Sequence, residues 1–461
     1  MTQPALRKEL TLTPATALVV SNMIGTGIFT TTGFLAGDLG RPGVVLGIWL
    51  VGALMVFAGC LSYSELGINF PRSGGEYVYV REAWGPAWGF MSGWVSFVAG
   101  FSGPVALSAM AFAEYLSSFF PALRVSQAGP KAFGFLNLAP GSLLAVGLIA
   151  GLAIVNILGV SLASRLQSAL SLMTLGVLAL FLVLAFAVGN GDWQNLMQEA
   201  ARTSRHALAP QFAASLVFVM FAYSGWNAAT YVVEEMKDPG RTLPRALLGG
   251  AGLVALFYVA LNAAFIYALP LESLKGVVSV GATAAQALFG DRIGGFFVVV
   301  MALALLGCVS AMSLVGPRVY FAMARDGCFF PDAGRVHPRW QTPVRAILYQ
   351  FVAASVLVLT GTFETLMTYV GFALVLFAAL ATAGLLRLRR RAGWKRLAAV
   401  SWSYPLVPLV FMLMSVWMLA YSLSLRPRAS LLGLLTIALG GVLYHRKFRR
   451  SHRVPNQESH G

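Results

Sequence analysis

Long runs of apolar residues constrain this fold more than any other feature. A helix needs about 20 apolar residues to cross a lipid bilayer, and such runs recur along the whole 461-residue chain. Charged residues make up only 11% of it, against roughly 25% in a soluble domain. The sequence therefore predicts an all-α polytopic membrane protein. The twelve predicted transmembrane helices are 14–37, 43–66, 85–116, 141–158, 163–189, 211–234, 246–269, 294–322, 343–361, 364–386, 401–421 and 430–445.

The basic residues are shared unequally between the loops on the two sides of the membrane. Of the 33 Lys and Arg residues, 24 fall in the termini, in the loops that follow the even-numbered spans, or at the span ends beside those loops. Cytoplasmic loops of membrane proteins are enriched in Lys and Arg. Both termini are thus predicted to be cytoplasmic, in a protein of the plasma or inner membrane. The net charge of +16 is expected to face anionic lipid, and no nucleic acid is expected as a partner.

The first span carries an unusual stretch, SNMIGTGIFTTTG at 21–33. A segment in lipid must satisfy its backbone polar groups internally, so a glycine-rich interruption is tolerated only beside a cavity or a ligand. Gly25 and Gly27 predict that the helix breaks here. Its first half would end near Met23–Ile24, and its second half would begin near Thr26–Gly27. The alternative is a continuous helix in which both glycines serve packing.

The sixth span has a similar interruption, with Ser224 and Gly225 at its centre. Spans one and six would cross the membrane in opposite directions. Paired interruptions of this kind indicate an inverted repeat and a transporter site near the midplane. The sequence predicts a single transporter domain over 1–461, with five-helix repeats at 14–189 and 211–386. Helices 11 and 12 would follow at 401–445.

The ends of broken helices offer opposite charges to a small ligand. Free N–H groups at a helix N-terminus bind anions, and free carbonyls at a C-terminus attract cations. A molecule that carries both an ammonium and a carboxylate, such as an α-amino acid, fits this arrangement. The N–H groups of Thr26, Gly27 and Ile28 would bind its carboxylate, and the carbonyls of Met23, Phe221 and Ser224 its ammonium. The full predicted site contains Met23, Ile24, Gly25, Thr26, Gly27, Ile28, Phe221, Ser224, Gly225, Trp226 and Asn227.

The side chains around these breaks are mostly apolar. No Asp, Glu, Lys or Arg lies in the central parts of spans 1, 3, 6, 8 or 10, which favours a neutral substrate. Phe221 is interpreted either as a lid over the ligand or as a packed core residue. Asn227 either binds the ligand or caps the second half-helix.

Four stretches resemble the amino acid–polyamine–organocation superfamily, and its L-type amino acid transporter branch with bacterial relatives in particular. They are 6–29, 62–86 (SYSELGINFPRSGGEYVYVREAWGP), 221–247 and 316–327. The resemblance implies a LeuT-like fold of five plus five helices with two more at the C-terminus. It also implies alternating access and a substrate site formed by Met23, Thr26, Gly27, Phe221, Ser224 and Asn227. The implied activity is transport of amino acids by a permease, with no enzymatic activity and no cofactor.

Two departures from the family pattern affect coupling and partners. Many relatives carry a lysine in helix 5 where this chain has Thr174. Thr174, Ser310 and Ser313 are a candidate cation or water site, since hard cations favour oxygen ligands. Alternatively, the three hydroxyls bond to their own helices. The loop at 117–140 lacks cysteine, so no disulfide-linked accessory subunit is expected.

Three alternative functions make different demands on the sequence. A carrier of cationic amino acids or polyamines would need an acidic residue that faces the site, and none is predicted there. A membrane enzyme would need clustered His, Asp or Glu at membrane depth, whereas four of the five histidines fall in loops or tails. A membrane amino-acid sensor would need an additional cytoplasmic domain. Exchange, uniport and ion-coupled symport remain open, and no metal site is predicted.

Overall fold

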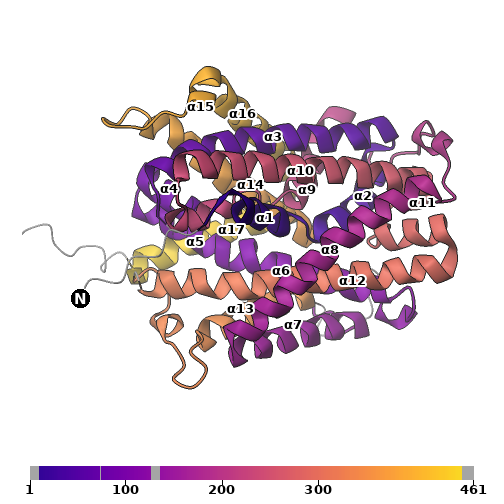
Figure 1. The fold of residues 1–461 in the computed structure, drawn as a ribbon, viewed down its shortest axis with the longest axis horizontal. Coiled ribbons are helices and arrows are strands. Elements are labelled where there is room, and N and C mark those ends of the chain that lie inside the picture. Colours follow the sequence, from indigo (N-terminus) through magenta and orange to yellow (C-terminus); the bar gives the residue numbers. More distant parts are fainter. Residues whose placement is uncertain (1–9, 73, 126–134, 326, 449–461) are drawn as a thin grey trace, which may run out of the picture.

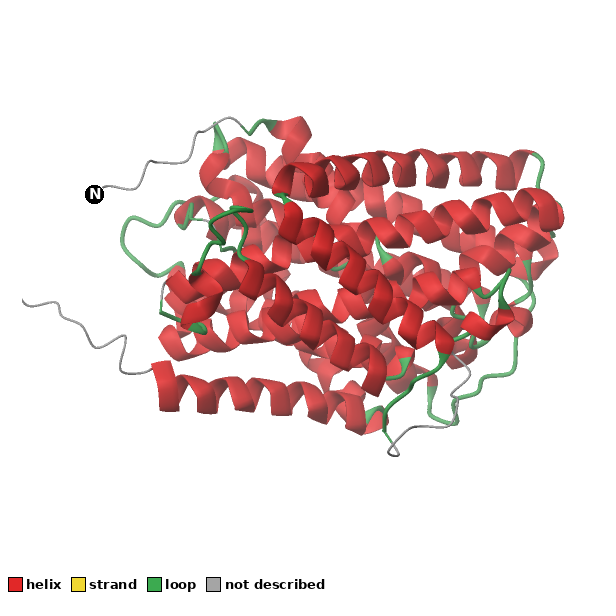
Figure 2. Ribbon diagram, turned by 90° about the horizontal axis from the view of Figure 1, so that it is seen from below, coloured by secondary structure: helices red, strands yellow, loops and turns green. Residues whose placement is uncertain are grey.

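The computed structural model describes residues 10–72, 74–125, 135–325 and 327–448, and these form a bundle of helices (Figures 1 and 2). Most of the long helices run along one common axis, with α8 crossing them obliquely (Figure 1). The helices that coincide with the twelve predicted spans are α1 (Leu12–Met23) with α2 (Thr26–Leu39), α3 (Pro42–Asn69), α5 (Pro86–Val95) with η1 (Ser96–Phe101) and α6 (Ser102–Leu116), α7 (Pro140–Leu158), α8 (Val160–Ala187), α9 (Leu208–Ala222) with η4 (Ala228–Glu235), α10 (Pro239–Ala268), α12 (Val280–Arg325), α13 (Val344–Thr360), α14 (Phe363–Leu388), α16 (Leu406–Leu425) and α17 (Pro427–Leu443).

Within the described residues, eight helices are long and apolar enough to cross a membrane, and the bent pair of α1 and α2 makes a ninth span. Three further apolar helices, at Leu172–Ala187, Leu208–Ala222 and Val344–Thr360, are shorter. They lie where the fifth, sixth and ninth spans are predicted. The all-α membrane fold is thus confirmed, while the number of twelve crossings stays a prediction.

One predicted boundary was wrong. The eleventh span does not begin at 401, because α15 (Ala398–Ser403) is a separate short helix and α16 starts at Leu406. Pro405 lies between them, where its missing N–H and fixed φ suit the start of a helix. Within Val280–Arg325, two helices meet at Gly290, whose φ of 71° and ψ of 179° are not helical but are readily adopted by glycine. The helix of the eighth span therefore begins just after Gly290, close to the predicted start at 294.

The two ends of the bundle carry different short elements. α4 (Glu76–Trp84) and α15 lie at one end, and α11 (Leu271–Leu274) lies at the other (Figure 1). At the α11 end, the ring of Phe34 on α2 stacks on Phe363 of α14, with centroids 6.1 Å apart, and also contacts Phe218 of α9. Asp38 at the end of α2 pairs with Arg426 at 2.6 Å. Apolar and ionic contacts therefore close this end of the bundle around α2.

Candidate functional site

The first predicted break is present at the expected residues. α1 ends at Met23 and α2 begins at Thr26, and the two helices are bent by 42°. Between them, Ile24 and Gly25 have extended backbone, with ψ of 101° at Ile24 and φ of −149° at Gly25. Local sequence accounts for this position, because glycine loses more conformational freedom on folding than any other residue and destabilises a helix relative to alanine.

The second break is also present. α9 ends at Ala222, and the chain then turns over 223–227 before the 3-10 helix η4 starts at Ala228. Gly225 has a φ of 93°, in the left-handed region where a side chain would be strained. α9 thus ends just before the predicted interruption at Ser224 and Gly225.

Glycines bring the two breaks into direct contact. A Cβ at Gly27 would lie 2.2 Å from the Cα of Ala222, and a Cβ at Gly225 would lie 2.5 Å from the carbonyl oxygen of Asn22. Both distances are far below ordinary contact. Glycine is therefore needed at each position, because the backbone of the opposing helix leaves no room for a side chain. Gly27 itself is helical, within α2. Its role in the structure is therefore close helix packing at the break.

One side chain that the sequence analysis missed joins the two breaks. The hydroxyl of Tyr258 on α10 lies 2.6 Å from the carbonyl oxygen of Met23 and 3.1 Å from that of Ala222. These carbonyls are at the free C-terminal ends of α1 and α9, where intrahelical partners run out. Tyr258 thereby satisfies the negative ends of both half-helices. Asn262, one turn further along α10, bonds the hydroxyl of Thr32 on α2.

The positive end, at the start of α2, faces α6 and α12. The hydroxyl of Thr26 is hydrogen-bonded to that of Ser108 on α6. The thiol of Cys308 on α12 interacts with both the backbone amide and the hydroxyl of Thr26. A Cβ at Gly25 would lie 2.9 Å from the same sulfur. The backbone amide of Thr26, which was predicted to bind the carboxylate of the substrate, therefore faces Cys308 in this structure.

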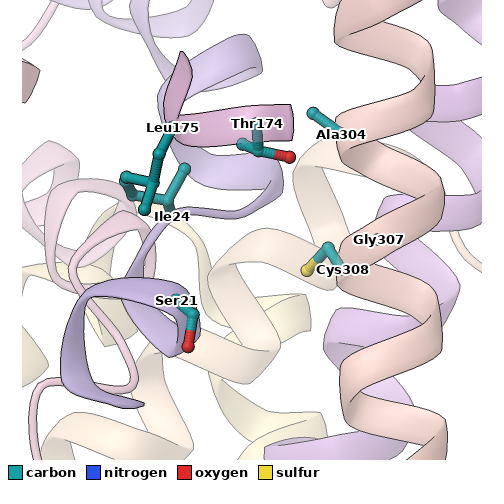
Figure 3. A pocket seen from close by; sticks show the side chains of 7 residues that line it. All are labelled: Ser21, Ile24, Thr174, Leu175, Ala304, Gly307 and Cys308. Carbon is teal, nitrogen blue, oxygen red and sulfur yellow. The ribbon is translucent and has the colours of Figure 1, made fainter. Parts of the chain in front are cut away.

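A small cavity of about 20 Å³ opens beside the first break (Figure 3). It is lined by Ser21 and Ile24 from α1 and the break, Thr174 and Leu175 from α8, and Ala304, Gly307 and Cys308 from α12. Figure 3 shows the Thr174 hydroxyl pointing toward α12 and the Cys308 sulfur pointing toward α1.

The three hydroxyls of the candidate cation or water site do not share this cavity. Thr174 lines it but donates its hydroxyl proton to the Leu170 carbonyl of its own helix, at 2.8 Å. Ser310 is buried. Ser313 lines a different cavity with Asn156 of α7. The alternative in which the hydroxyl bonds to its own helix thus holds for Thr174. Of the three residues, Thr174 is the one that lines the cavity beside the break.

A second cavity, of about 40 Å³, lies beside the break in the sixth span. Its lining includes Ser224, Gly225, Trp226 and Asn227 from the break, Met220 from α9, three apolar residues of α14, and Glu76 from α4. The carboxylate of Glu76 accepts a 2.6 Å hydrogen bond from the hydroxyl of Tyr63 on α3. The sequence analysis found no acidic residue facing the site, and Glu76 corrects this.

The remaining predicted residues are buried around the breaks. Met23, Ile28 and Phe221 are core residues, and the ring of Trp226 packs edge-on to Tyr63 with centroids 4.6 Å apart. The carbonyl of Phe221 accepts the backbone N–H of Ser224 at 3.0 Å. The side chain of Asn227 does not cap η4 and instead interacts with Tyr231.

The sequence matches known transport proteins along most of its length. Residues 10–431 match the family described as "Amino acid permease". The chain is 30% identical to the human protein named large neutral amino acids transporter small subunit 2, over 95% of this chain and 80% of that protein. It is 31% identical to the serine/threonine exchanger SteT of Bacillus subtilis, over 91% and 92%. It is 30% identical to the mouse Asc-type amino acid transporter 1, over 97% and 84%.

Proposed function

Since this chain belongs to the amino acid permease family, and is thus a multi-pass membrane transporter rather than an enzyme, we propose that it exchanges neutral L-amino acids. The observation that carries the proposal is the meeting of two helix breaks, at Ile24–Gly25 and at 223–227. Their free ends bind both charged groups of an α-amino acid without an ionised side chain.

We favour exchange over uniport because one relative is named an exchanger. The substrates in the relatives' names are neutral amino acids. Met220 on α9, Trp226 in the second break and Leu374 on α14 give this side an apolar lining. Selectivity among apolar side chains is expected to be loose, because one methylene contributes only about 1–3 kcal/mol.

The transport cycle follows from the repeats predicted at 14–189 and 211–386. The substrate, bound at the predicted residues around the two breaks, would reach either side as the broken helices and their neighbours rock against the rest of the bundle. Binding requires the Tyr258 hydroxyl and Cys308 to give up part of their contacts with the breaks. The proposal places both termini in the cytoplasm of a cell with the protein in its plasma or inner membrane.

A second candidate substrate class is cationic amino acids, and Glu76 is the observation that favours it. A carboxylate beside the second break is what a positively charged side chain would need. Burial raises the pKa of the Glu76 carboxyl to about 7, although the Tyr63 hydrogen bond lowers it in part. A carboxyl that is half neutral at physiological pH is a weak counter-ion, so neutral substrates remain the better assignment.

Exchange in proteoliposomes tests the substrate class. Liposomes loaded with unlabelled L-threonine are supplied outside with labelled L-threonine and a tenfold excess of each competitor. Neutral L-amino acids are expected to compete, whereas N-acetyl-threonine, threonine methyl ester and L-lysine are not. Competition by the acetylated or esterified compound would contradict the two-ended site, and competition by lysine would favour the cationic class.

Two matched conditions address coupling and partners. Replacement of external sodium by choline tests Thr174 as part of a cation site, because sodium-stimulated exchange would be lost in Thr174→Ala. Exchange by the purified chain alone tests the expectation that no disulfide-linked subunit is needed. The human relative is named a small subunit, so failure of the lone chain would count against that expectation.

A further inference from the structure

Glu76 is a buried carboxyl that the amino-acid exchange described above does not use. It is the first residue of α4, and only 8% of it is exposed. α4 lies at the end of the bundle opposite α11, beside α14 (Figure 1). Burying an ionisable group costs free energy. Because Glu76 bears this cost beside the break that the proposed transport cycle would open, we expect the carboxyl to have a function.

The titratable groups nearest to Glu76 are tyrosines. Tyr63 from α3 donates a hydrogen bond to its carboxylate, and Tyr231 from η4 interacts with it electrostatically. Tyr79 on α4 packs edge-on to Tyr63, with centroids 5.4 Å apart. From α14 the facing residues of the shared cavity are Leu374, Val375 and Ala378, and α5 (Pro86–Val95) contains no titratable side chain. Among the described residues, no salt bridge to Glu76 is present.

η4 is the element that covers Glu76. Gly75, just before Glu76, has a φ of 49°, and a Cβ there would lie 2.7 Å from the Thr230 hydroxyl on η4. Trp226, in the turn that precedes η4, lies against Tyr63, the hydrogen-bond partner of Glu76. Movement of η4 away from α4 would therefore expose the carboxyl to water. The cavity beside it, of about 40 Å³, already exceeds the roughly 10–15 Å³ that one water needs.

We propose that Glu76 is a proton-binding site that couples the closure of η4 against α4 to pH. The proton is bound while η4 covers the carboxyl, and it passes to cytoplasmic water when η4 moves away, leaving the carboxylate hydrated. No other bond is made or broken. This inference rests on the proposed function for the movement of η4, but not on the identity of the substrate.

The sign of the pH effect follows from linkage. Burial raises the pKa of Glu76 to about 7 in the closed arrangement, whereas a hydrated glutamate has a pKa of about 4.3. The closed arrangement is therefore favoured fully below about pH 4.3, and this advantage is lost as the pH rises through 7. Opening releases up to one proton, so the ratio of open to closed protein is expected to rise by up to about tenfold per pH unit between these values. Above about pH 7 it levels off.

Hydrogen–deuterium exchange of the full-length protein in nanodiscs tests this without relying on transport. The amides of η4, Ala228–Glu235, are followed in wild type and in Glu76→Gln between pH 5 and 8. Comparison at the same pH cancels the intrinsic pH dependence of exchange. At pH 5 wild-type η4 is expected to exchange only about fivefold faster than the variant, and this difference is expected to grow at least tenfold further by pH 7.5. Equal rates of the two proteins across the whole range would overturn the proposal.

Tyr63→Phe provides a second variant that keeps the ring and removes one hydroxyl. Its hydrogen bond lowers the pKa of Glu76, so its loss is expected to raise that pKa. The exchange of η4 should then continue to increase above pH 7, where wild type levels off. A purely structural role for Tyr63 would change exchange equally at every pH, and that outcome would contradict proton binding at Glu76. Failure of amino-acid exchange in liposomes, with this pH profile intact, would instead count against the proposed function.

Discussion

Replacement of Gly27 by alanine tests the contact between the two breaks most directly. The new Cβ would lie 2.2 Å from the Cα and 2.4 Å from the Cβ of Ala222, where ordinary contact begins at 3.4 Å. Relief requires α2 and α9 to separate by about 1 Å, because the obstructing atoms are backbone and a methyl group and no flexible side chain can move aside. Overpacking of this kind typically costs about 1–3 kcal/mol. That corresponds to roughly a 5- to 150-fold change in an equilibrium.

The expected consequence is specific to the site. A separation of about 1 Å would take the Tyr258 hydroxyl beyond hydrogen-bond range of the Ala222 carbonyl, which is already 3.1 Å away. Exchange of labelled L-threonine in proteoliposomes is expected to fall by at least tenfold in Gly27→Ala, and to be abolished in Gly27→Val.

Gly47→Ala is the matched control for this prediction. Gly47 lies on α3, and a Cβ there meets nothing within 4 Å. This variant is expected to transport at the wild-type rate, with unchanged elution in size-exclusion chromatography. If Gly27→Ala exchanged substrate as fast as Gly47→Ala, the argument that the two helix backbones must touch would be refuted.

Three further substitutions probe neighbouring contacts. Tyr258→Phe leaves two buried carbonyls without their donor and is expected to lower stability by about 1–3 kcal/mol, measured as a lower thermal unfolding midpoint. Alkylation by N-ethylmaleimide is expected to block exchange, with protection by saturating L-threonine and no block in Cys308→Ala; block of that variant would contradict the placement of Cys308 beside the break. Asp38→Asn removes the nearer of two carboxylates that pair with Arg426, in a pair whose side chains are 16% and 12% exposed, and is expected to lower the unfolding midpoint. Arg241→Gln, in an exposed pair, is expected to change it little.

The location of Glu76 shows where reasoning from the sequence reached its limit. The residue lies in the stretch 62–86 that carries part of the family resemblance, yet it precedes the third span and looks like a loop residue. Two glycines with positive φ, Gly74 and Gly75, turn the chain so that α4 packs against η4. A tertiary contact between residues more than 150 positions apart therefore buried a carboxyl that local hydropathy placed outside the bundle.

The sequence by itself determined where the apolar helices lie and where two of them are interrupted. Both are local properties: apolar length decides which segments enter lipid, and glycine decides where a helix can be interrupted. For this reason the break at Gly25 and the end of α9 fell where they were predicted.

Only the tertiary structure decided what faces the breaks. The bridge from Tyr258, the approach of Cys308 to Thr26, and the separation of Thr174 from Ser313 all depend on which face each helix presents to another. Membrane helices are apolar all round, so their hydropathy pattern specifies rotation about the helix axis only weakly. Close packing of small residues fixes that rotation instead, and it brings together residues that are far apart in the chain.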